Sequence, residues 1–262
     1  MKKIILMLCA AVLVFAAGCS FYPPIDGSGF PKTTSFDSTG FVNLAVEHPF
    51  KVRIVPDTVF SVSVTCDDNI VPYLVVEMGT DALRLSLMGG YNYRNVILAA
   101  EVHMPALTGL TMSGASEAHI EAGFVSSQPL GVTLSGASTV EFAAVGCGPF
   151  TTAVSGASTF TATSISSSSF TATVSGASTV TASGSTIAEV LNVSGASGAH
   201  LQNLLAAQAS VQLSGSSKSW VNVGNGQITL TASGASTLYY VGSPTFVING
   251  LSGGSGIEKL SS

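Results

Sequence analysis

The chain has 262 residues, a formal net charge of −5 at pH 7, and charged side chains at only 9% of its positions. A typical soluble domain has charged side chains at about a quarter of its positions. In this chain, Ser, Thr, Gly and Ala take the place of the missing charged residues. The acidic balance argues against nucleic acid as a partner, because phosphate binding requires clustered Lys and Arg. The length suits one all-β domain, and the small residues recur too regularly for a disordered chain.

Residues 1–18 have the pattern of a secretory signal peptide. Lys2 and Lys3 form a basic start, and an apolar run follows from Ile4 to Ala17. This run is shorter than the ~20 apolar residues that a transmembrane helix needs. It ends in Ala16-Ala17-Gly18-Cys19, which resembles a lipobox, where signal peptidase II cuts before the cysteine and a lipid is attached to its thiol.

The lipobox predicts that residues 1–18 are removed and that Cys19 carries acyl chains such as palmitate. The lipid membrane is then a partner, and we expect the protein in the cell envelope, anchored to the outer membrane. No run of acidic residues follows Cys19, so the periplasmic and the outer face both stay open. The alternative is an ordinary secretory signal with an incidental cysteine.

Residues 19–35 are rich in proline and glycine, and we expect a flexible tether there. Two further cysteines, Cys66 and Cys147, lie 81 positions apart in β-like patterns. Neither has a CxxC spacing or a neighbouring histidine, which argues against a metal or redox role. Whether they are buried thiols or a disulfide is open.

Residues 36–112 contain short stretches in which apolar and polar residues alternate. Phe50, Val52 and Ile54 alternate with Lys51 and Arg53, and the same pattern recurs twice further on. Half-buried strands have this period of two. We expect wider early coils here, or a β-cap that protects the edge of the first regular coil.

Residues 113–258 are built on the tetrapeptide Ser-Gly-Ala-Ser or a close variant. The first serines of the copies are Ser113, Ser135, Ser155, Ser175, Ser194, Ser214, Ser233 and Ser252. Successive copies therefore begin roughly 20 residues apart, and a near-constant period of this size indicates a repeat architecture. Helical solenoids have repeats of about 33 residues or more, and the Leu pattern of leucine-rich repeats is absent.

Apolar residues recur at one and three positions before this serine and at five and seven positions after it. The first of these rows is Met112, Leu134, Val154, Val174, Val193, Leu213 and Ala232. A spacing of two is the strand period, so each repeat is predicted to contain a strand, a tight corner and a second strand. A third, less regular side contains pairs such as Ile165 with Phe170 and Ile187 with Val190.

This pattern predicts an all-β fold, a single-stranded β-helix solenoid with coils of about 20 residues. Each coil pairs with the next at about 4.8 Å. Glycine as the second corner residue suits a backbone with positive φ. The corner serines are expected to bond backbone groups at the bend.

Several motifs resemble the DUF2807 family, the "putative auto-transporter adhesin, head GIN domain" proteins. They are Phe50-x-Val52-x-Ile54, Cys66-Asp67-Asp68-Asn69-Ile70, Asp81-x-Leu83-x-Leu85, and Met104-Pro105-x-Leu107-x-x-Leu110 leading into Ser113-Gly114-Ala115-Ser116. The ending Gly242-Ser243-Pro244 is similar too. The resemblance covers residues 36–258 as one domain and implies a right-handed β-helix, common in lipoproteins of Gram-negative bacteria. It supplies no catalytic or binding residues.

An enzyme acting on polysaccharides is the main alternative, since β-helices often do so. Such enzymes need clustered acids, for calcium or for protonating a glycosidic oxygen. No Asp and no Arg occur from residue 104 to 262. Glu117, Glu121 and Glu141 are close in the repeat alignment, and we interpret them as a solvated patch. We expect no catalytic residues, no metal site and no cofactor.

One outward row of the repeats carries large side chains. His119 and His200 share this row but lie four coils apart, about 19 Å at the strand spacing, too far for one metal ion. Trp220 and Tyr239 are on successive coils and form a candidate ligand platform, since aromatic pairs bind sugars or proteins. The alternative is a cross-coil pair that covers the terminal coils.

Asp37-Ser38-Thr39 and Asp57-Thr58-Val59 resemble the Asp-Ser/Thr-apolar site of an O-glycosylation system of some anaerobic Gram-negative bacteria. The sequence leaves glycosylation of Ser38 and Thr58 open. Taken together, the features predict a non-catalytic envelope lipoprotein that acts as an adhesin or as a binding or structural module, with a glycan or a protein as ligand.

Overall fold

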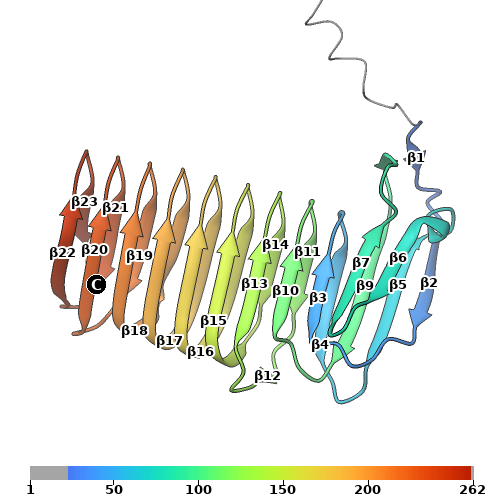
Figure 1. Ribbon diagram of the computed structural model, residues 1–262, viewed down its shortest axis with the longest axis horizontal. Helices are drawn as coiled ribbons and strands as arrows, with labels where there is room; N and C mark the ends of the chain where they lie inside the picture. Colours follow the sequence, from blue (N-terminus) through green and yellow to red (C-terminus); the bar gives the residue numbers. More distant parts are fainter. Residues whose placement is uncertain (1–22, 261–262) are drawn as a thin grey trace, which may run out of the picture.

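The computed structural model describes residues 23–260, in which strands stack coil upon coil along one axis and a small β-cap covers the N-terminal end (Figure 1). One continuous sheet contains 21 strands, and β1 and β8 form a separate two-stranded sheet. The described part contains no α-helix, only the 3₁₀ turn η1 (Val71–Tyr73). The predicted β-solenoid, with one coil per repeat of the corner tetrapeptide, is confirmed.

The regular coils consist of strands joined by the glycine-containing corners. In chain order they are β10 (Gly109–Met112), β11 (Glu117–Ile120), β12 (Phe124–Val125), β13 (Leu130–Leu134), β14 (Thr139–Phe142), β15 (Val145–Val154), β16 (Thr159–Val174), β17 (Thr179–Val193), β18 (Gly198–Leu213), β19 (Lys218–Asn222), β20 (Gln227–Ala232), β21 (Thr237–Val241), β22 (Thr245–Leu251) and β23 (Gly256–Lys259). Each pairs in parallel with the equivalent strand of a neighbouring coil.

The N-terminal region contains two more coils and an antiparallel cap. The coil strands are β3 (Asn43–Val46), β4 (Lys51–Pro56), β7 (Ala82–Leu87) and β9 (Leu98–Met104), and the cap strands are β2 (Pro31–Phe36), β5 (Ser61–Asp67) and β6 (Leu74–Met78). The short strands β1 (Ile25–Asp26) and β8 (Tyr93–Arg94) lie beside the cap (Figure 1). In the cap, β5 pairs with β9, β6 with β7, and β2 with β5.

These first coils are not stacked in chain order. Strand β3 lies between β7 and β10, and β4 lies between β9 and β11. The chain therefore lays down the second coil first, turns back to build the cap and the first coil, and only then enters the regular repeat. Strands β5 and β6 cover the edges of β9 and β7 with antiparallel pairing, which protects the parallel stack at this end.

The expectation of a flexible tether over residues 19–35 is wrong for the later part of this segment. Residues 31–36 form strand β2, which pairs with β5 along its whole length, and the hydroxyl oxygens of Thr33 and Thr65 are 2.8 Å apart. Pro31 is tolerated because it begins the strand, where a missing N–H does not break the ladder. Ile25 and Asp26 pair with Tyr93 and Arg94. Residues 1–22, which include the predicted signal peptide and Cys19, lie outside the described residues.

The rows that the repeat alignment predicted to face inward are buried, apart from Tyr240 near the C-terminal end, which is partly buried. The row one position before the corner, from Met112 to Ala232, is at most 3% exposed. In the middle of the solenoid the interior is filled by four phenylalanine rings with centroids 5.6–5.9 Å apart, Phe142, Phe150, Phe160 and Phe170. Ring pairs at this separation pack favourably beyond the area that they bury.

The corner glycines meet the backbone of the preceding coil. Gly176 has φ of 78°, and an added Cβ atom there would lie 2.5 Å from the carbonyl oxygen of Gly156. That same oxygen accepts a 2.8 Å hydrogen bond from the amide of Ala177. The last corner serine is buried, and the Ser178 hydroxyl donates to the Gly156 oxygen at 3.3 Å. The predicted serine–backbone bonds at the bend are therefore confirmed.

We expect Gly176→Ala to destabilise the protein by about 3 kcal/mol or more. Losses this large arise when a substitution strains the backbone or collides with packed atoms. Gly40→Ala is the matched control, because Gly40 has φ of 81° but nothing within 4 Å of an added Cβ. Gly40→Ala should lose only the ~1–2 kcal/mol that an L-residue costs in a left-handed backbone conformation. Urea unfolding of both variants measures the difference, and equal losses would contradict a tight contact between corners.

On the third side of the coil that contains β17, an acidic residue takes an inward position. Ile187 points outward and is 63% exposed, whereas Glu189 occupies the inward row between Phe170 and Ala209. This coil is one residue shorter than its predecessor, and the pairing is irregular on both sides of it. The Glu189 carboxyl is buried without a hydrogen-bond partner. Burial raises the pKa of Glu189 well above its usual range.

We expect a stability that falls as pH rises, because Glu189 must stay protonated in the folded protein while it ionises above about pH 4.3 in the unfolded chain. The free energy of unfolding should decrease by up to ~1.4 kcal/mol per pH unit until the folded-state pKa is passed. Glu189→Gln should remove this slope, and Glu258→Gln, at an exposed position, should keep it. Unfolding midpoints from pH 5 to 8 test this; a slope unchanged in Glu189→Gln would refute it.

Candidate functional site

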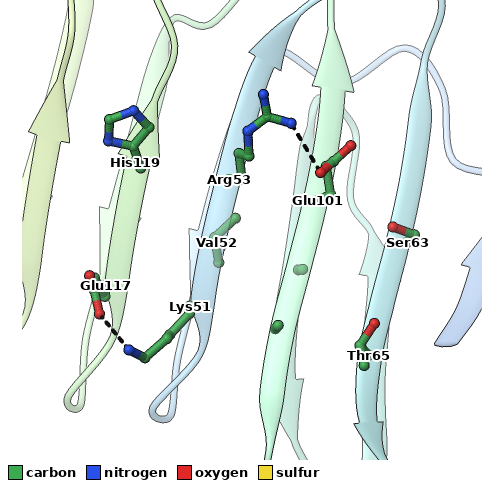
Figure 2. Close-up of a pocket in the computed structure, with 10 residues that line it drawn as sticks. Lys51, Val52, Arg53, Ser63, Thr65, Glu101, Glu117 and His119 are labelled. Atoms are coloured by element: carbon green, nitrogen blue, oxygen red, sulfur yellow. Dashed lines mark hydrogen bonds and ion pairs between the residues drawn. The ribbon is translucent and has the colours of Figure 1, made fainter. Parts of the chain in front are cut away.

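A groove of about 550 Å³, lined by charged, hydroxyl-bearing and small apolar residues, lies where the parallel coils meet the antiparallel cap (Figure 2). Its walls are outward residues of the four neighbouring strands β11, β4, β9 and β5. The alternation that buries Val52 and Ile54 turns Lys51 and Arg53 of the same strand toward this surface. The groove is therefore a direct product of the strand period.

The pairing register arranges the groove in two rows across the strands. One row contains His119, Arg53, Glu101 and Ser63, and the other contains Glu117, Lys51, Ala99 and Thr65. Figure 2 shows the labelled side chains of both rows on neighbouring strands. Ala99 has a single methyl group between the longer Lys51 and Thr65, which explains why the surface is hollow there.

Charged groups in and beside the groove are paired. Lys51 Nζ is 3.2 Å from Glu117, and Arg53 contacts Glu101 and Glu121, each at 3.1 Å. The Glu101 and Glu121 carboxylates raise the pKa of Arg53 through these hydrogen bonds. The groove thus offers N–H donors and carboxylate acceptors without a large excess of either charge.

His103 extends this network on β9. Its ring nitrogens lie 2.8 Å from Glu101 and 3.1 Å from Asp57. The Glu101 carboxylate, followed by Asp57, raises the pKa of His103. In return, hydrogen bonds from His103 and Arg53 lower the pKa of Glu101, so this acid is held in its ionised form.

Sequence reasoning found only part of this groove. Glu117, Glu121 and Glu141 were expected as a solvated patch, and they do lie close together, with His119 3.7–3.8 Å from Glu141 and Glu121. Lys51 and Arg53 were missed as their partners, because β4 precedes β11 by more than sixty positions. Only the stacking of β4 directly against β11 brings them together. The alternation of basic and apolar residues in 50–54 was the available signal.

In the outward aromatic row, the rings of His200, Trp220 and Tyr239 stack face to face on neighbouring coils. The His200 and Trp220 rings are 4.2 Å apart at 12°, and the Trp220 and Tyr239 rings are 4.9 Å apart at 10°. Trp220 and Tyr239 are therefore neighbours, as the alignment predicted, and His200 joins them. Their facing surfaces cover one another, and Glu258 follows Tyr239 in the same row. A contact by this row must use ring edges, and its role as a ligand platform stays a prediction.

The other flagged residues are separate from the groove. Cys66 and Cys147 are free thiols; burial raises the pKa of Cys147 to about 11, which makes it a poor nucleophile. Thr58 is exposed and Ser38 is partly buried. Within residues 23–260, no group of three or more His, Cys, Asp or Glu is placed to hold a metal ion. The same residues contain no helix that is long and apolar enough to cross a membrane.

Comparison with known proteins gives the fold and the family. A "putative lipid binding protein" from Parabacteroides distasonis has a TM-score of 0.84 and 17% identity, covering 91% of this chain and 100% of its own. A "putative adhesin" from Parabacteroides merdae has a TM-score of 0.84 and 12% identity, covering 92% of this chain and 100% of its own. A "putative adhesin" from Bacteroides fragilis has a TM-score of 0.67 and 18% identity, covering 90% and 100%.

Identities this low show a shared fold and no more. No curated protein matches the chain at a significant level. Residues 40–244 match the family described as "Putative auto-transporter adhesin, head GIN domain", DUF2807. This span is most of the chain and includes the groove and the repeat coils up to β21, and the protein therefore belongs to the DUF2807 family.

Proposed function

We propose that the protein is a non-catalytic module of the cell envelope, lipid-anchored through Cys19 to the outer membrane, that binds a glycan in the groove beside Arg53. The adhesin description of the family supports a role in surface binding. The lipobox-like Ala16-Ala17-Gly18-Cys19 supports the anchor. The solenoid supports a rigid carrier, since each coil is held by its neighbours through main-chain hydrogen bonds.

The groove carries the proposal of a glycan ligand. Arg53 and Lys51 supply donors, Glu101 and Glu117 supply acceptors, and Ser63 and Thr65 supply both. A sugar hydroxyl also donates and accepts, so it can replace water at each of these groups without leaving a charge unpaired. A phosphate-rich ligand fits poorly, because the two cations are already neutralised by carboxylates. The volume of about 550 Å³ is within the usual range of ligand sites.

The charge states of the acids favour binding over hydrolysis. A glycosidase needs a carboxylic acid with a raised pKa beside the scissile bond. In the groove, Glu101 has a lowered pKa because His103 and Arg53 stabilise its charge. Glu189 has a raised pKa, but its carboxyl oxygens are sealed in the core away from the groove. These properties weigh against the carbohydrate-active enzyme.

Binding to a glycan array, with reducing-sugar release measured in parallel, tests the proposal. Ala99→Phe should fill the hollow without removing any charged group and should weaken binding at least tenfold. Ala153→Phe, also at a small outward-row position of β15, is the control and should bind as the wild type does. The Trp220→Ala, Tyr239→Ala double variant should bind normally too.

Three results would count against this function. Full binding by Ala99→Phe would show that the ligand does not bind in the groove. Loss of binding in the Trp220 and Tyr239 double variant would show that it binds at the aromatic row. Release of reducing sugar by the wild type would restore the enzyme alternative. Thermal unfolding of each variant shows whether a loss of binding reflects a loss of fold.

A further inference from the structure

The N-terminal segment of the described chain is fixed close to the predicted lipid anchor. Strand β1 pairs with β8, and Gly27 donates a 3.0 Å hydrogen bond to the carbonyl of Arg94. Cys19 precedes Ile25 by only six positions. Six residues span at most about 21 Å when fully extended. Because residues 31–36 are locked into β2, a lipid on Cys19 holds the cap end of the solenoid next to the bilayer.

The loop beside β1 carries an aromatic cluster, while the charged residues Asp26 and Arg94 flank it in β1 and β8. The rings of Tyr73, Tyr91 and Tyr93 form a cluster with centroids 5.0–6.2 Å apart. Met88 and Tyr91 are 44% and 41% exposed, and residues 88–93 contain no charged side chain. We call Tyr73, Met88, Tyr91 and Tyr93 the tyrosine patch. Its loop is held in shape by the Tyr93 hydroxyl, which donates to the Met88 carbonyl at 2.7 Å.

We propose that the tyrosine patch rests on the bilayer surface and fixes the orientation of the anchored solenoid. This inference depends on the lipid anchor of the proposed function. Tyrosine suits the membrane–water interface because its ring is apolar and its hydroxyl stays hydrated. Exposed Arg94 follows the patch directly and is placed to meet anionic headgroups. The short link to Cys19 keeps the patch at a high effective concentration near the membrane, so even a weak contact is occupied.

An exposed apolar surface at the far end of the solenoid cannot take this role while Cys19 is the anchor. Val247, Ile248 and Leu251 are 41–49% exposed on β22. Strand β22 is at the opposite end of the solenoid from β1 (Figure 1). All the regular coils separate it from the cap, which is far beyond the reach of six residues. Val247 therefore serves as an internal control of similar exposure.

Tryptophan fluorescence in vesicles tests the contact. Full-length protein carrying Trp220→Phe and Tyr91→Trp is expressed with its signal, purified in detergent and reconstituted into phosphatidylethanolamine–phosphatidylglycerol vesicles with brominated acyl chains. We expect quenching at least twofold stronger than for the matched Trp220→Phe, Val247→Trp protein. Both proteins should unfold at the same temperature as the Trp220→Phe parent.

The two proposals can fail separately. An acylated Cys19, shown by mass spectrometry, together with equal quenching at the two positions would overturn the tyrosine patch contact and leave the anchor standing. A chain without acyl mass on Cys19 would overturn the anchor and the patch contact together. Adding Met88→Ser to the Tyr91→Trp protein should reduce quenching, and unchanged quenching would also contradict a contact made by the patch.

Discussion

The hydrogen bond from one corner to the next is the constraint on which the rest of this structure depends. The amide of Ala137 donates to Gly114, Ala157 to Gly136, and Ala177 to Gly156, each at 2.8 Å. The corner can come this close only because glycine has no Cβ atom to meet the carbonyl of the coil before it. A side chain at that position collides with backbone atoms of the preceding coil, and these cannot move aside as a flexible side chain can. The near-constant period of the repeat follows, because each coil must return its glycine to the same place.

This fixed return determines what the surface can present. A residue at one repeat position lies beside the residue at the same position in the next coil, so outward side chains form continuous rows. In one row the result is a stack of His200, Trp220 and Tyr239 rings. At the cap the result is the groove, where two such rows continue from parallel strands onto the antiparallel strand β5. The binding properties of this fold therefore depend on which side chains occupy the same outward position in successive coils.

The regular part of the fold was predictable because its signal is local and repeated. Apolar residues one and three positions before each corner face inward, and the buried row from Met112 to Ala232 agrees. The errors arose where a contact depends on distant parts of the chain. Nothing near Pro31 reveals that residues 31–36 pair with β5. The inward position of Glu189, in contrast, could have been found from the repeat, because Glu189 lies five positions before a corner serine, as Phe170 and Ala209 do. The groove needed the stacking of β4 between β9 and β11.

Removal of one whole coil tests the central claim most directly. Deleting residues 194–213 joins Val193 to Ser214, two positions that precede and begin equivalent corners. If corner-to-corner registration determines the fold, this protein should remain folded, with one cooperative unfolding transition and a strand content per residue like that of the wild type. Deleting residues 194–203 alone breaks the return of the glycine and should abolish folding. An unfolded whole-coil deletion, or a folded half-coil deletion, would contradict the account.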